Sequence, residues 1–323
     1  MEILNLLIFV ASLFVLWKGA DFLVKGASGI AKLTGMGAFL AGFIVVALGT
    51  SAPEFVVSLI AIVMNSSDIA VGNMVGSNIA NIGLIFGLTV LISPIMISKE
   101  AWNEQKLPLG FLVLMTLAAY GLSRMGFSIG RGEGVLLFFL LIVFLSVPYR
   151  RSREEKNEIL SAQQSDSGWK LLFYVVLGSV LLSGSAHFLV KSAIGMATEL
   201  GISELFIGVT AVALGTSLPE LGASLVAAWR KEQNIVVGNI IGSNFFNLGF
   251  LGLVAVIRPP VDVNQNMFGN TSEFAFLILL TVLFVGLIGK TRISSRNRIG
   301  KKKGALLLIL YAAFLYFISG SLS

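Results

Sequence analysis

The chain has 323 residues, of which 56% are hydrophobic and only 12% are charged. Soluble domains carry about 25% charged residues, so this composition indicates an integral membrane protein. The lack of cysteine and the single histidine, His187, exclude disulfides, thiolate chemistry and a zinc cluster. The net charge of +6 comes from basic residues beside apolar segments, so we expect no nucleic-acid partner.

Ten apolar segments are long enough to cross a bilayer. In chain order they are residues 3–23, 36–63, 69–95, 107–123, 131–149, 169–190, 201–228, 234–257, 272–289 and 304–320. The first lacks the basic residues that open a signal peptide, so we interpret it as a retained membrane helix. The sequence therefore predicts an all-α integral membrane protein with ten transmembrane helices and the lipid bilayer as its partner.

Two motifs occur twice, at residues 47–81 and again at 213–247, offset by 166 positions. Ala-Leu-Gly-Thr-Ser-Ala-Pro-Glu at 47–54 matches Ala-Leu-Gly-Thr-Ser-Leu-Pro-Glu at 213–220. Gly-Asn-Met-Val-Gly-Ser-Asn-Ile-Ala-Asn at 72–81 matches Gly-Asn-Ile-Ile-Gly-Ser-Asn-Phe-Phe-Asn at 238–247. This duplication divides the chain into a first five-helix repeat (1–149), a linker (150–168) and a second five-helix repeat (169–323). Because five is odd, the second repeat enters the membrane from the other side, which predicts an inverted repeat.

The loop charges give an orientation. Residues 290–303 carry seven basic residues and no acidic one, and the linker 150–168 begins Arg-Arg-Ser-Arg. Both segments are therefore predicted to be cytoplasmic, whereas 259–273, which has no Lys or Arg, is predicted to lie outside. Ten helices then place both termini on the extracellular side of a plasma membrane.

Each repeat places one glutamate, Glu54 or Glu220, in an apolar segment, where an ionised side chain costs several kcal/mol unless it is paired. Two such carboxylates at matching positions indicate that a cation lies between them. Side chains four residues apart share one face of a helix. Four pairs have this spacing, namely Thr50 with Glu54, Thr216 with Glu220, Ser77 with Asn81, and Ser243 with Asn247.

Backbone oxygens are expected to join these side chains. Pro53 and Pro219 are predicted to break or loosen their helices and to free carbonyl groups four residues before them. The carbonyls expected to face the site are those of Gly49, Gly215, Ala47 and Ala213. Carboxylate, hydroxyl, amide and carbonyl oxygens form the kind of ligand set that Ca²⁺ takes. Na⁺ accepts the same atoms, whereas Mg²⁺ dehydrates reluctantly and suits such a site less well.

Other polar and small residues have structural interpretations. Gly72 with Gly76, and Gly238 with Gly242, have the spacing that lets membrane helices approach closely. Asp21 stands where the second repeat has His187, so it is not a symmetric ligand, and an interfacial role is expected. The remaining amides of the second motif are expected to cross-link helices rather than bind an ion, namely those of Asn73, Asn78, Asn239 and Asn244.

Gly-Thr-Ser-x-Pro-Glu followed by Gly-Asn-x-x-Gly-Ser-Asn, present twice, resembles the α-repeats of the cation/Ca²⁺ exchanger superfamily, and is most similar to prokaryotic Na⁺/Ca²⁺ exchangers. The resemblance implies a secondary transporter rather than an enzyme, without a cofactor. Such a protein exchanges several Na⁺ for one Ca²⁺ by alternating access to a mid-membrane site, and its first and sixth helices slide as a gate. The implied shared carboxylates are Glu54 and Glu220. The implied further ligands are Thr50, Thr216 and the backbone of Ala47 and Ala213, with Ser51, Ser77, Ser217 and Ser243 lining the Na⁺ positions.

One position bears on the coupling ion. Some relatives have Asp where this chain has Asn247, so the cluster holds two formal negative charges rather than three. This favours Na⁺ coupling over K⁺ coupling, and Gly76-Ser77, where H⁺-coupled relatives usually have an acidic residue and His, disfavours H⁺ coupling. The alternatives are an H⁺- or K⁺-coupled Ca²⁺ antiporter and a passive cation channel in which two facing carboxylates form a filter. An intramembrane enzyme ranks last because no HExxH pattern or nucleophile with its base is visible.

Overall fold

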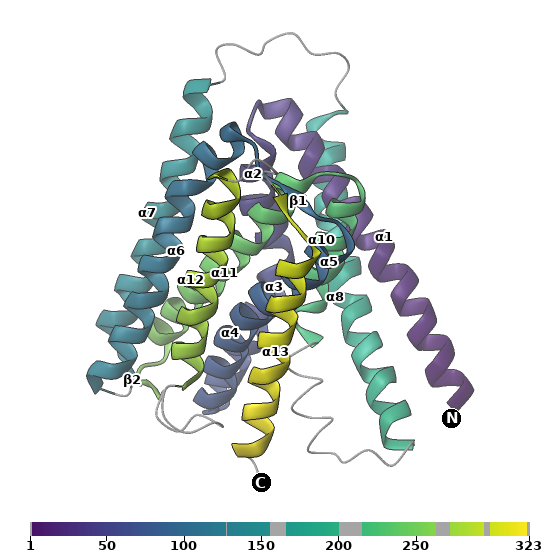
Figure 1. Cartoon of the computed structure of the whole chain (residues 1–323). Helices are drawn as coiled ribbons and strands as arrows, with labels where there is room; N and C mark the ends of the chain where they lie inside the picture. The colour runs from purple at the N-terminus through teal and green to yellow at the C-terminus, as the bar shows by residue number, and fades with distance from the viewer. Residues whose placement is uncertain are drawn as a thin grey trace.

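The computed structural model describes residues 2–126, 128–155, 166–199, 215–262, 272–293 and 298–321. These residues form a bundle of long helices with very short strands in the connections (Figure 1). Within the described part, seven helices are long and apolar enough to cross a membrane. They span Leu4–Thr34, Ala38–Val63, Ile69–Ile92, Ala101–Leu122, Gly168–Met196, Gln233–Ile257 and Glu273–Lys290.

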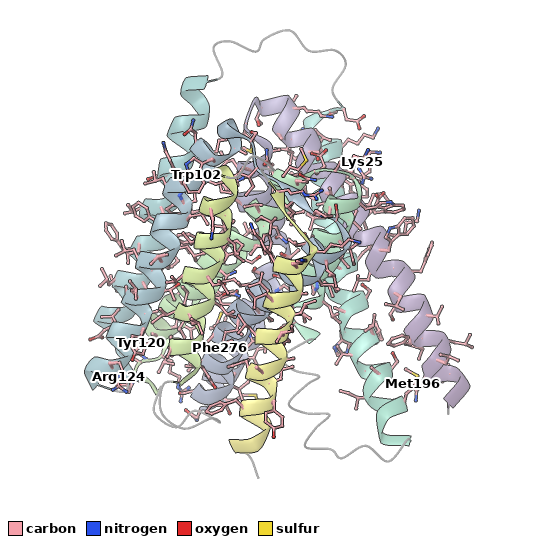
Figure 2. All side chains as sticks on the ribbon, in the orientation of Figure 1. Lys25, Trp102, Tyr120, Arg124, Met196 and Phe276 are labelled. Carbon is pink, nitrogen blue, oxygen red and sulfur yellow. The ribbon has the colours of Figure 1, made fainter. Side chains whose placement is uncertain are left out.

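In the first half the helices are α1 (Glu2–Thr34), α2 (Ala38–Ala41), α3 (Ala47–Val63), α4 (Ser67–Ala80), α5 (Gly87–Ile92), α6 (Lys99–Gly126) and α7 (Arg131–Glu155). The second half contains α8 (Gly168–Glu199), α10 (Leu218–Trp229), α11 (Gln233–Ile257), α12 (Ser272–Ile293) and α13 (Lys301–Ser321). The predicted segments 131–149 and 304–320 are thus helical as well. Of the predicted segment 201–228, residues 201–214 lie outside the described residues. Trp102 and Arg124 mark opposite ends of α6 (Figure 2).

The first helix is longer than its predicted segment. The apolar segment was predicted to end at residue 23, and this boundary is wrong, since α1 continues to Thr34. The ammonium group of Lys25 lies 4.8 Å from the ring centre of Tyr174 on α8. A lysine placed over an aromatic ring in this way is stabilised without leaving the helix.

Helices α1 and α8 pack antiparallel through glycines. A Cβ atom added at Gly19 would lie 2.9 Å from the backbone nitrogen of Leu182, and one added at Gly178 would lie 2.5 Å from that of Leu23. Farther along α1, Gly26 meets the backbone of Leu171, earlier in α8. The two helices therefore run in opposite directions, and their glycines allow close backbone contact.

Helix α11 packs against the start of the second membrane segment as closely as α1 packs against α8. Added Cβ atoms at Gly238 and Gly242 would lie 2.2 Å from the carbonyl oxygen of Phe39 and 2.3 Å from that of Phe43. The predicted close approach is confirmed for these two glycines. No described atom lies within 4 Å of a Cβ added at Gly72 or at Gly76.

Helix irregularities differ between the two halves. Pro53 lies inside α3, so the helix is not broken there, and the irregular turn of this segment is the π-helix η1 (Gly42–Val46) just upstream. A π-turn widens a helix locally by shifting its hydrogen bonds by one residue. In the second half the prediction is confirmed, because a turn at residues 216–217 precedes α10, whose first turn contains Pro219. A second π-helix, η2 (Asn81–Phe86), follows α4.

Four short strands join the halves at opposite ends of the bundle (Figure 1). Strand β1 (Ile95–Met96) pairs antiparallel with β4 (Arg298–Ile299), and β2 (Ser128–Ile129) pairs antiparallel with β3 (Val261–Asp262). Each sheet thus takes one strand from each half of the chain.

Candidate functional site

The centre of the bundle contains two buried glutamates. Glu54 on α3 and Glu220 on α10 are both 0% exposed, and their carboxyl groups are close enough to interact electrostatically. Both carboxylate oxygens of Glu54, and Oε2 of Glu220, have no hydrogen-bond partner among the described residues. Buried carboxylates are costly unless they are neutralised, so the pair requires a proton or a cation.

The serines beside the glutamates are equivalent in sequence but differ in their contacts. Ser51 donates a hydrogen bond of 2.9 Å to Oε1 of Glu220, across the boundary between the repeats. Its counterpart Ser217 lies 3.3 Å from the hydroxyl of Ser77 instead. One carboxylate is therefore held by a hydroxyl and the other has both oxygens available for a ligand.

The threonines also reach across to the opposite repeat. Thr50 donates to Oδ1 of Asn239 at 3.4 Å, and Thr216 donates to Oδ1 of Asn73 at 3.1 Å. The two contacts are counterparts under the sequence offset. The Thr50 hydroxyl also donates to the carbonyl oxygen of Ala47 at 3.3 Å, so its proton is shared between two acceptors, and this predicted backbone ligand lies beside a predicted side-chain ligand.

The asparagines at the ends of the second motif also differ. Asn247 on α11 donates to Oδ1 of Asn78 at 3.0 Å, and Asn78 in turn donates to the carbonyl of Asn244 at 3.2 Å. Asn81, the first residue of η2, is 1% exposed, and both of its amide atoms lack a partner among the described residues. The hydroxyl of Ser243 and Oδ1 of Asn247 also lack one. Oxygens therefore remain available on both repeats.

The structure brings most predicted site residues to this region through α3, α4, η2, α10 and α11. Ala213 is the predicted ligand that lies outside the described residues. No group of three or more His, Cys, Asp or Glu side chains occurs in the described part of the chain. The cluster therefore offers two carboxylates with neutral hydroxyl, amide and carbonyl oxygens, which suits a hard cation.

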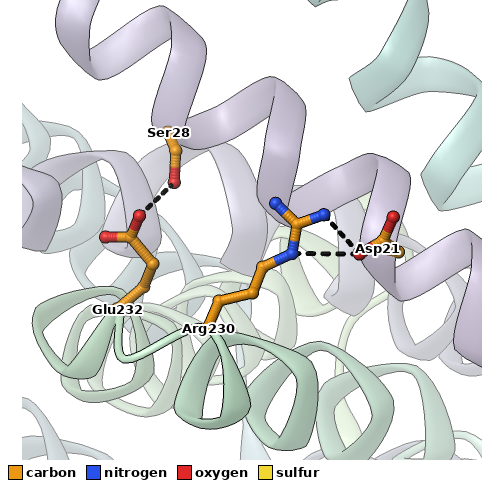
Figure 3. Close-up of polar contacts among 4 residues, drawn as sticks. All are labelled: Asp21, Ser28, Arg230 and Glu232. Carbon is orange, nitrogen blue, oxygen red and sulfur yellow. Dashed lines mark hydrogen bonds and ion pairs between the residues drawn. The ribbon is translucent and has the colours of Figure 1, made fainter.

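Sequence reasoning missed the partners of Asp21. Arg230 donates to Oδ1 of Asp21 through both Nε, at 2.9 Å, and Nη2, and Ser28 donates to Glu232 at 3.2 Å (Figure 3). Both contacts join α1 to the turn between α10 and α11. Asp21 is thus paired away from the buried glutamates, and the interfacial interpretation fits this position. No sequence signal indicated Arg230 as the partner, because the two residues are 209 positions apart in the chain.

These features define a class of protein, namely a helical membrane protein whose two sequence repeats enclose a buried oxygen-rich cluster. The family model described as sodium/calcium exchanger protein matches residues 4–150 and 170–320. The chain therefore belongs to the sodium/calcium exchanger family, whose members are membrane antiporters.

Individual relatives cover nearly the whole chain. It is 35% identical to the putative antiporter CaxA of Alkalimonas amylolytica, over 99% of this chain and 100% of that protein. It is 31% identical to the sodium/calcium exchanger MaX1 of Methanosarcina acetivorans, over 96% and 97%. Among solved structures, the sodium-calcium exchanger NCX_Mj soaked with zero Na⁺ and Ca²⁺ matches with a TM-score of 0.83 and 31% identity, covering 98% of this chain and 99% of that one.

Proposed function

We propose that this protein is an antiporter that exchanges several Na⁺ for one Ca²⁺. The observation that carries the proposal is the pair of fully buried glutamates with three unpartnered carboxylate oxygens. One Ca²⁺ between two carboxylates balances their charge, and neutral oxygens nearby complete its coordination. Several Na⁺ ions can compete for the same oxygens, which couples the two fluxes.

The ion site in this proposal uses both copies of the duplicated motifs. Its side-chain ligands come from Glu54, Glu220, Thr50, Thr216, Ser51, Ser217, Ser77, Ser243, Asn81 and Asn247, and its backbone ligands from Ala47 and Ala213. The many unpartnered oxygens in this set support the assignment, because buried polar atoms in proteins are rarely left without a partner.

Alternating access through an inverted repeat of ten helices is part of the same proposal. Three reciprocal features support it: α1 and α8 run antiparallel, each short sheet takes one strand from each half, and the threonine–asparagine contacts cross between the repeats in both directions. An inverted repeat places equivalent groups on opposite sides of the membrane, so the site can open to either side by related movements. We place the linker in the cytoplasm and both termini outside a plasma membrane.

Ca²⁺ uptake into proteoliposomes loaded with Na⁺ tests the coupling ion. We expect uptake when Na⁺ is present inside and diluted outside, and none when Na⁺ is equal on both sides. Uptake that persists without a Na⁺ gradient points to a passive channel and contradicts the proposal. Uptake driven by a pH gradient or requiring K⁺ supports the H⁺- or K⁺-coupled alternative instead.

A further inference from the structure

Asn73 and Asn239 occupy the second position of the duplicated Gly-Asn-x-x-Gly-Ser-Asn motif and form matching sets of hydrogen bonds. Asn73 is 7% exposed and Asn239 is 0% exposed. The side-chain oxygen of each accepts a hydrogen bond from the threonine of the opposite repeat, Thr216 or Thr50. A buried amide has few possible partners. Its orientation therefore decides whether the threonine hydroxyl donates a hydrogen bond to the amide oxygen or accepts one from the amide nitrogen.

The other end of each amide is anchored within its own repeat. The Nδ2 group of Asn73 donates to the hydroxyl of Ser58 at 2.9 Å and to the backbone carbonyl of Glu54 at 3.0 Å. The Nδ2 group of Asn239 donates to Ser224 at 3.0 Å, the counterpart of Ser58. Each amide therefore joins the helix that carries one glutamate to the threonine of the other repeat.

In the first repeat, the anchor fixes the direction of this chain of hydrogen bonds. The carbonyl of Glu54 can only accept, so the amide atom of Asn73 that faces it must be Nδ2. Oδ1 then faces Thr216, and because this oxygen can only accept, the threonine must donate its single proton to it. Both hydroxyl lone pairs of Thr216 then accept no hydrogen bond from the described residues. A reversed amide would turn a donor toward the threonine and release the hydroxyl proton, which repels a cation.

We propose that Asn73 and Asn239 are positioning residues of the ion site. Asn73 takes the hydroxyl proton of Thr216, and Asn239 takes that of Thr50 together with the carbonyl of Ala47, so that each threonine oxygen presents lone pairs to the transported cation. This role rests on the proposed function, because it requires the threonines to be ion ligands. Neither asparagine touches the ion, and both act through Thr50 and Thr216. The arrangement also ties the ligand of one repeat to the glutamate helix of the other.

Double-mutant cycles on ion affinity test the proposal. The dissociation constant for Ca²⁺ is measured by isothermal titration calorimetry on the purified full chain carrying Asn73→Ala, Thr216→Val or both. Loss of one neutral hydrogen bond corresponds to a roughly 2- to 12-fold weaker affinity. We expect each single variant to lose at least this much Ca²⁺ affinity. The double variant should bind Ca²⁺ no more weakly than whichever single variant binds it less tightly. The mirror pair, Asn239→Ala with Thr50→Val, should couple in the same direction but less strongly, because the Thr50 hydroxyl also donates to the carbonyl of Ala47.

The matched control exchanges the partners. Asn73 shares no hydrogen bond with Thr50 among the described residues. Asn73→Ala combined with Thr50→Val should therefore give additive losses. If the asparagine had only a structural role, replacing it would lower the unfolding temperature. Its effect on Ca²⁺ affinity would then not depend on which threonine is also replaced.

The possible results separate the two proposals. If the wild-type chain binds no Ca²⁺, the proposed function fails. If it binds Ca²⁺ but the hydrogen-bonded pairs are additive, or the exchanged pairs are equally coupled, the positioning role alone is overturned. If Asn73→Ala does not fold, Ser58→Ala removes one of the two hydrogen bonds that anchor the amide, leaves the one to the carbonyl of Glu54, and so loosens the orientation of the amide without deleting it. It should weaken Ca²⁺ binding in the wild-type background and have no effect in the Thr216→Val background, and an equal effect in both would overturn the positioning role.

Discussion

Replacing Gly242 by alanine should separate α11 from the helix that carries Glu54. The added Cβ atom would lie 2.3 Å from the carbonyl oxygen of Phe43 and 2.7 Å from Cβ of Ala47. Carbon and oxygen atoms in close contact stand roughly 3.3 Å apart, so the two backbones must move apart by about 1 Å. No flexible side chain can turn aside, because the closest atom belongs to the backbone.

The expected energy follows from this geometry. Overpacking of a tight interface typically costs about 1–3 kcal/mol, and contact with a fixed backbone places this variant toward the upper end. The movement also shifts Ala47 and the neighbouring Ser243, both of which are proposed ligands. We therefore expect Gly242→Ala to unfold at a lower temperature than the wild type and to gain less stability on addition of Ca²⁺.

Thermal unfolding of the purified protein in detergent, with and without Ca²⁺, measures both effects. Gly286→Ala is the matched control, since no described atom lies within 4 Å of its added Cβ. Alanine is favoured over glycine inside a helix by about 1 kcal/mol, so this control should be as stable as the wild type or slightly more stable. If Gly242→Ala matched the control in unfolding temperature and in Ca²⁺ response, the reasoning about close packing would be refuted.

Three further predictions concern the polar residues. Ser51→Ala should weaken Ca²⁺ binding more than Ser217→Ala. The first removes a hydrogen bond to a carboxylate, worth about 1.5–3 kcal/mol, and the second removes one between hydroxyls, worth about 0.5–1.5 kcal/mol. Equal losses of Ca²⁺ affinity in calorimetry would contradict the observed difference between the serines. Asn247→Asp should make exchange sensitive to pH, because a third carboxyl beside two others tends to keep a proton; an unchanged pH profile of Ca²⁺ uptake would argue against its proximity to the glutamates. Asp21→Asn should leave Na⁺-driven uptake largely intact and lower stability by no more than about 1 kcal/mol, since its partly exposed ion pair lies away from the cluster; abolished uptake would show that the pair is essential.

The duplicated motifs made much of the fold and of the candidate site predictable. A buried glutamate in each copy pointed to a shared cluster, and Asn78 was among the asparagines expected to cross-link helices, as it does by donating to the carbonyl of Asn244. Such groups can be located from sequence because burial of a polar group in a membrane demands a partner, and the repeat limits where that partner can lie.

The differences between the two copies could not be predicted in the same way. Ser51 and Ser217 stand in nearly identical local sequences, yet among the described residues only Ser51 donates a hydrogen bond to a glutamate. Such a difference arises from the relative positions of whole helices rather than from local sequence. The two prolines show the same limit, because Pro53 lies within a helix and Pro219 starts one. The π-helix upstream of Pro53 has an ordinary apolar sequence with no marker of its geometry.

The central claim is that Glu54 and Glu220 together hold the exchanged ions, and calorimetric titration of the purified chain with Ca²⁺ tests it most directly. The wild-type protein should bind one Ca²⁺ per chain and lose this binding as Na⁺ is added. Glu54→Gln and Glu220→Gln should each remove the binding, because either change leaves a single carboxylate to balance a divalent ion. Ca²⁺ binding at wild-type affinity in either variant, or binding that Na⁺ does not displace, would contradict the account.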